Sequence, residues 1–171
     1  MAKRTNAAPV ALGGVFAALA VVIMSLGGLI PAATFVCPML CMLLQAFVLK
    51  QCGNRIAWAW YGAVAILSVL LGPDKEAVAV FVFLGYYSIL KPKMDALPVA
   101  WLWKGMFFNV AILAMYWLLI NLFGMAELIA EFGEMGTGMT LATLVLGNMT
   151  FFLLDMLLTR GIRFRLLKKH N

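Results

Sequence analysis

The sequence contains little charge and few residues that support catalysis. Of its 171 residues, 12% are charged, 65% are hydrophobic and one is a histidine. A soluble domain averages about 25% charged residues and roughly half apolar ones. A chain of this size also has too much surface to cover for so many apolar side chains to fit inside a soluble core. The composition therefore argues against a soluble domain and favours an integral membrane protein.

Catalytic and metal-binding signatures are also missing. His170 is next to last in a basic tail, and there is no Ser-His-Asp set, HExxH, phosphate loop or CxxC pair. Cys37 and Cys41 lie four residues apart in an apolar stretch, without a second pair or a nearby histidine to complete a metal site. We therefore expect no enzyme activity, no cofactor and no metal. Without an ATP-binding motif, the chain alone cannot couple hydrolysis to transport.

Six apolar runs predict an all-α fold, a single polytopic membrane domain (residues 1–171) of six transmembrane helices. Because every backbone amide must be paired inside hydrocarbon, each run is most simply a helix. The second and fourth runs are shorter than the roughly 20 residues of a standard span, so either could be a half-helix or a re-entrant segment. The predicted helices cover residues 10–30, 35–49, 56–72, 77–90, 99–123 and 139–159.

The distribution of charge predicts that both termini are cytoplasmic. Cytoplasmic loops are enriched in Lys and Arg. With six spans and the N-terminus inside, only Lys75 among the basic residues falls on the outer side. Five of the seven acidic residues, at positions 74, 76, 127, 131 and 134, also fall there. Topology therefore explains the net charge of +6, and we expect the lipid bilayer, not nucleic acid, as the partner.

Two ionisable residues and several amides lie inside the predicted spans. Lys104 and Asp155 sit about one turn from the cytoplasmic ends of the fifth and sixth helices. Because an intramembrane charge is costly and normally finds a partner, we predict that they pair, as a structural lock more than as a proton or ion pathway. Asn109 and Asn148 occupy the middles of the same helices and are placed to hydrogen bond across them. Gln45 and Asn121 are further deep polar residues.

The turn between the third and fourth helices, residues 72–76, has the sequence Gly-Pro-Asp-Lys-Glu. Its two carboxylates flank an ammonium group at the outer face. A solvated turn explains this composition, and so does a charged rim that holds a polar or zwitterionic ligand. The glycine-rich outer loop at residues 124–138 has two readings as well, a lid or a solvated acidic loop.

The first helix reads Ala11-Leu12-Gly13-Gly14-Val15-Phe16-Ala17-Ala18-Leu19-Ala20. It resembles the opening of the substrate-binding S components of energy-coupling-factor (ECF) transporters. Segments 72–76 and 85–91 are similar to bacterial membrane proteins of this general type. The resemblance implies six helices with both termini inside, in the bacterial inner or plasma membrane. Small residues of the first helix would contact a coupling transmembrane subunit joined to two ATPases; the candidates here are Ala7, Ala11, Gly13, Gly14, Ala17 and Ala18.

The resemblance also implies a function, uptake of a vitamin or similar small molecule through an outward-facing pocket. The sequence lacks the sets of residues that would identify riboflavin, thiamin, biotin, folate or a metal as the ligand. An alternative is a non-transporting membrane scaffold or interaction protein, similar to MreD, that uses the same six helices without a ligand. The candidate residues of the pocket rim are Asp74, Lys75, Glu76, Tyr116, Trp117 and Asn121.

Overall fold

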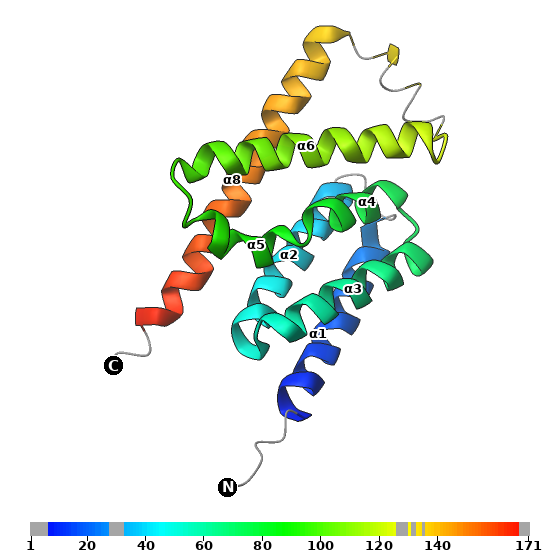
Figure 1. Cartoon of the computed structure of the whole chain (residues 1–171). Helices are drawn as coiled ribbons and strands as arrows, with labels where there is room; N and C mark the ends of the chain where they lie inside the picture. Colours follow the sequence, from blue (N-terminus) through cyan, green and yellow to red (C-terminus); the bar gives the residue numbers. More distant parts are fainter. Residues whose placement is uncertain (1–6, 28–32, 126–129, 131–132, 135, 168–171) are drawn as a thin grey trace, which may run out of the picture. The chain divides into compact units, whose positions relative to one another are not determined.

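The computed structural model describes residues 7–27, 33–125, 130, 133–134 and 136–167, and these residues form helices, turns and short connections without a strand. Six segments are long and apolar enough to cross a membrane, as the six apolar runs predicted. The predicted lid, residues 124–138, lies in part outside the described residues. The helices are α1 (Ala7–Leu26), α2 (Ala33–Cys52), α3 (Asn54–Leu71), α4 (Lys75–Leu84), α5 (Tyr87–Met94), α6 (Ala100–Asn121) and α8 (Thr137–Leu167) (Figure 1).

The two short predicted helices are both long enough to span. Helix α2 has 20 residues, because its polar end from Lys50 to Cys52 continues the helix beyond the apolar run. The fourth span, Lys75–Met94, also has 20 residues but consists of α4 and α5, which are separated by a turn at Gly85 and Tyr86. Both turn residues keep helical dihedral angles, so the direction of the chain changes little.

Glycine is required at this turn because a Cβ atom at Gly85 would overlap the carbonyl oxygen of Phe81, one turn earlier on α4. A Cβ atom at Gly85 would lie 3.1 Å from the ring of Tyr61 on α3, which is tighter than ordinary van der Waals contact. The Tyr61 hydroxyl donates a hydrogen bond to the carbonyl of Val82 on α4. The backbone of α4 therefore demands glycine at this turn, and the contact with α3 holds the turn in place.

The chain forms two compact units, Met1–Asp95 and Ala96–Asn171. In the first unit, α1 and α2 pack side by side and two thiols join them. The Sγ of Cys52 donates to the carbonyl of Pro9 (3.3 Å), and the Sγ of Cys41 donates to the carbonyl of Ala20 (3.5 Å). Because the two contacts progress in opposite directions along the two helices, α1 and α2 are antiparallel and their register is set.

Helix α3 follows α2 after a single residue, Gly53, whose φ of 86° is a conformation that favours glycine. Helix α3 runs parallel to α1, because the start of α1 contacts the start of α3 at Ile56, and Gly27 after the end of α1 contacts Asp74 just beyond the end of α3. Gly13 of α1 is buried, and a Cβ atom there would lie 3.3 Å from the side chain of Ile56 on α3. The second helix also contacts α5, because the hydroxyl of Ser88 donates to the carbonyl of Met42 (2.9 Å).

The second unit contains α6 and α8, which pack through aromatic and small residues. The rings of Phe108 and Phe151 stack with centroids 4.7 Å apart, and Gly147 leaves room for the edge of Phe108. Large apolar side chains cover one exposed face of α6 along its length, as expected for a helix that contacts lipid. More than half of the surface of each is accessible: Leu102, Met106, Val110, Leu113 and Trp117.

Candidate functional site

Asp74, a predicted rim residue, connects two helices of the first unit. It is the N-cap of α4, where its Oδ1 accepts a hydrogen bond from the amide of Ala77 (3.0 Å). Its Oδ2 accepts a second hydrogen bond from the hydroxyl of Thr34 in the first turn of α2 (2.7 Å). The carboxylate is also close to the positive end of the α4 dipole, which stabilises its charge. Asp74 therefore has a structural role that the sequence did not reveal.

Lys75 is used in a similar way at the end of α3. Its Nζ donates to the carbonyl of Gly72 (3.1 Å) and to that of Val69 (3.3 Å). These carbonyls lie at the C-terminus of α3, where helical partners are missing and a cation is favoured. Glu76 lies in the first turn of α4, beside the other two charges. The three predicted rim residues thus lie together in one turn, in which Asp74 and Lys75 bond to the fold itself.

The other predicted rim residues lie on α6 in the second unit. Trp117 and Asn121 share one exposed face of this helix, and the Nδ2 of Asn121 donates to the carbonyl of Trp117 (2.9 Å). Tyr116 projects from a different face and is half-buried. Trp117 is therefore placed to stack on a bound molecule or on lipid, and Tyr116 does not join it.

Lys104 and Asp155, which the sequence predicted to pair, are brought together between α6 and α8. The Nζ of Lys104 lies 3.0 Å from Oδ2 of Asp155, and the two side chains are 8% and 15% exposed. Gly105, next to Lys104, leaves room for the ring of Phe152 beside this pair. Shielding from water strengthens the attraction between the two charges.

Asn109 and Asn148 form a second polar link between the same two helices. Each amide nitrogen donates to the amide oxygen of the other residue, at 2.9 and 3.1 Å. The nitrogens also donate to the carbonyls one turn earlier in their own helices, those of Gly105 (2.8 Å) and Leu144 (2.9 Å). The amides therefore satisfy one another, and the arrangement is that of a lock between helices.

The predicted partner interface on α1 divides between two faces. Gly13 is buried against α3, and Ala17 packs against the core of the first unit. In contrast, Ala11, Gly14 and Ala18 are exposed, and a Cβ atom at Gly14 would meet no atom within 4 Å. The exposed small residues follow one another by three and four positions and therefore share one face of the helix.

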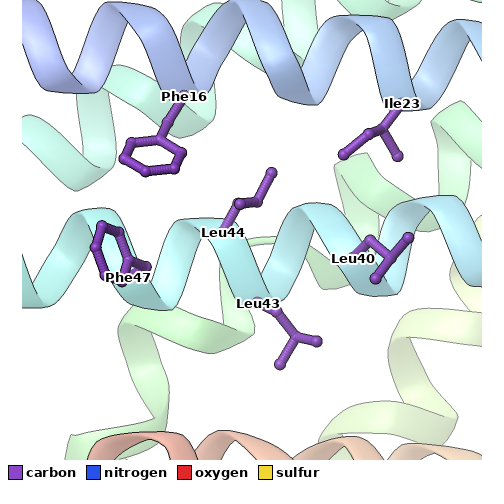
Figure 2. A pocket seen from close by; sticks show the side chains of 6 residues that line it. All are labelled: Phe16, Ile23, Leu40, Leu43, Leu44 and Phe47. Atoms are coloured by element: carbon purple, nitrogen blue, oxygen red, sulfur yellow. The ribbon is translucent and has the colours of Figure 1, made fainter. Parts of the chain in front are cut away.

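A groove of about 300 Å³ lies between α1 and α2. Its lining is entirely apolar, and two of these side chains, Phe16 and Ile23, point from α1 toward α2 (Figure 2). Sites for polar small molecules place a few hydrogen-bonding groups among apolar ones, and the groove has none. Its chemistry fits a hydrocarbon chain and not a charged vitamin. The full lining consists of Phe16, Ile23, Leu40, Leu43, Leu44 and Phe47.

One buried cation was missed by the sequence reasoning. Lys91 was predicted to lie in a cytoplasmic loop, but it is 1% exposed on α5. Its Nζ lies 3.3 Å from a carboxylate oxygen of Asp95, one turn later. The sequence did contain one indication of this burial. Lys91 follows Ser88 and Tyr87 by three and four residues, so it shares a helix face with these two side chains, which are also buried.

Comparison of the chain with protein-family models, with curated proteins and with solved structures gives no match. The description of this chain therefore rests on its own sequence and structure. The chain is an all-α protein with six candidate membrane spans, and its apolar exposed surface is suited to a lipid bilayer.

Proposed function

We propose that this chain is the substrate-binding membrane subunit of an ECF-type importer for a vitamin or similar small molecule. The observation that carries the proposal is the exposed stripe of small residues on α1, formed by Ala11, Gly14 and Ala18. The packing of α1 within its own unit uses Gly13 and Ala17 on another face. The small residues of this stripe are thus left over from the internal packing.

An exposed small-residue stripe suits contact with a helix of another subunit. In a membrane, lipid is as apolar as the side chains, so helix association depends on close packing of backbones. Small residues allow that approach, and an exposed stripe without a partner contributes nothing to the fold. The proposed partner is a coupling transmembrane subunit that carries ATPase subunits, since this chain contains no ATP-binding motif.

The proposed ligand binds at the outer side, in keeping with cytoplasmic termini and a location in the bacterial plasma membrane. The charged turn of Asp74, Lys75 and Glu76 in the first unit is the candidate contact for its polar groups. ATP hydrolysis in the partner subunits would then reorient this chain and release the ligand inside.

Co-purification tests this proposal. The tagged chain, extracted gently from its own membranes, is analysed by native mass spectrometry, which reports partners and retained small molecules together. We expect a complex with an ATPase-bearing assembly. Gly14→Leu or Ala18→Leu should reduce recovery of that assembly at least about tenfold, a loss of roughly 1.4 kcal/mol. Leu19→Phe, a change at an exposed position on another face of α1, is the matched control and should leave recovery unchanged.

A second candidate is a scaffold without a ligand, similar to MreD. The hydrogen bonds of Asp74 and Lys75 favour it, because both predicted rim charges are already used within the fold. The same mass spectra separate the two functions. A chain that is recovered with other membrane proteins, but with neither an ATPase nor a small molecule, refutes the importer and supports the scaffold.

A further inference from the structure

The interior of the first unit contains polar atoms without partners. Gln45 of α2 is fully buried, and neither its amide oxygen nor its amide nitrogen has a hydrogen-bond partner in the described part of the chain. Trp60 of α3 is 3% exposed, and its indole Nε1 likewise has no partner there. Buried polar side-chain atoms nearly always have partners, and the free energy lost without one is greater where lipid replaces water.

The two side chains lie at the same level of the helix packing. In the antiparallel register of α1 and α2, which the two thiol contacts set, Gln45 lies opposite Phe16. The helices α1 and α3 are parallel, and Gly13 contacts Ile56. One turn further along both helices, Trp60 therefore lies opposite Ala17, which follows Phe16 in the chain. Both residues also belong to the buried faces of their helices.

A direct hydrogen bond between the two residues would leave the amide nitrogen unpaired. The indole of Trp60 is only a donor, so it can bond to the amide oxygen of Gln45 alone. The amide nitrogen carries two donors and needs an acceptor.

We propose that Gln45 and Trp60 form an internal site for water in the first unit. Water accepts from the indole and from the amide nitrogen and donates to the amide oxygen, so it supplies the donor and the acceptors that these groups lack. An internal water typically makes about three such bonds. Both side chains are neutral, so the site would leave a bound ion without a counter-charge. This site is separate from the proposed outer rim and does not depend on the proposed function.

The site can be tested through the indole N–H signals of the five tryptophans. The protein is labelled with ¹⁵N-indole tryptophan in lipid nanodiscs, and exchange cross-peaks with water are recorded by NMR. The other tryptophans, at 58, 101, 103 and 117, are all exposed. Their replacement by phenylalanine assigns the Trp60 signal without changing the site. We expect a cross-peak between the Trp60 indole proton and a long-lived water, although the residue is buried.

Variants at Gln45 then test whether this residue holds the water that contacts the Trp60 indole. Gln45→Leu should remove the water cross-peak of Trp60 and shift its indole signal. Gln51→Leu changes an exposed amide on the same helix and should alter neither. If Gln45→Leu does not fold, the protein that retains Gln45 still shows by its own cross-peak whether a water contacts the Trp60 indole. A Trp60 indole without a water cross-peak, or one that contacts the Gln45 amide directly, overturns the proposal.

Discussion

The ion pair between Lys104 and Asp155 should contribute to stability only as a pair. The Nζ–Oδ2 distance is 3.0 Å, and at an effective dielectric constant of about 20 the attraction is on the order of 5 kcal/mol. Desolvation of both charges offsets much of that gain. Removal of one partner, however, leaves a buried charge alone, which costs about 3–5 kcal/mol. Lys104→Met and Asp155→Leu should each destabilise the protein by about 3 kcal/mol.

The double variant with both changes should recover most of that loss, because two apolar side chains of similar size replace the pair. With single losses of about 3 kcal/mol each and a double loss of about 1 kcal/mol, the coupling between the sites should then be on the order of 5 kcal/mol, above the roughly 0.5–3 kcal/mol that is usual for residues in direct contact. The assay is reversible unfolding in mixed micelles, with Lys93→Met as the control at an exposed lysine. Single variants that lose less than about 1 kcal/mol, as exposed ion pairs do, would refute the reasoning.

Three further changes test the packing of the helices by the same unfolding measurement. Asn109→Leu should lower stability by about 0.6–1.7 kcal/mol, the range for interhelical hydrogen bonds in membranes, and Asn148→Leu combined with it should add little; additive losses would contradict the reciprocal bond. Gly13→Leu should cost about 1–3 kcal/mol by overpacking against α3, whereas Gly14→Leu should change stability by less than about 0.5 kcal/mol; equal effects would contradict the assignment of faces. Asp74→Ala should cost about 1 kcal/mol or more through loss of the α4 cap, and an unchanged unfolding midpoint would show that the cap is dispensable.

The number of spans could be predicted because it depends on local composition. A backbone in hydrocarbon must form helices, so each long apolar run becomes one. The meeting of Lys104 with Asp155 followed from the same reasoning, since both lie near the corresponding ends of adjacent antiparallel spans. The turn at Gly85 was not predicted, because the apolar run continues through it and its contact with Tyr61 on α3 joins residues that are distant in sequence.

The sequence by itself determined that the chain has six apolar helices and which of its ends carry charge. Only the tertiary structure decided which face of each helix packs inside. In a soluble protein, the alternation of polar and apolar residues reveals that face. A helix in lipid is apolar on both sides, so the hydropathy pattern does not distinguish Gly13, which is buried, from Gly14, which is exposed. The burial of Gln45, Trp60 and Lys91 was decided in the same way, by the rotation of helices against their neighbours.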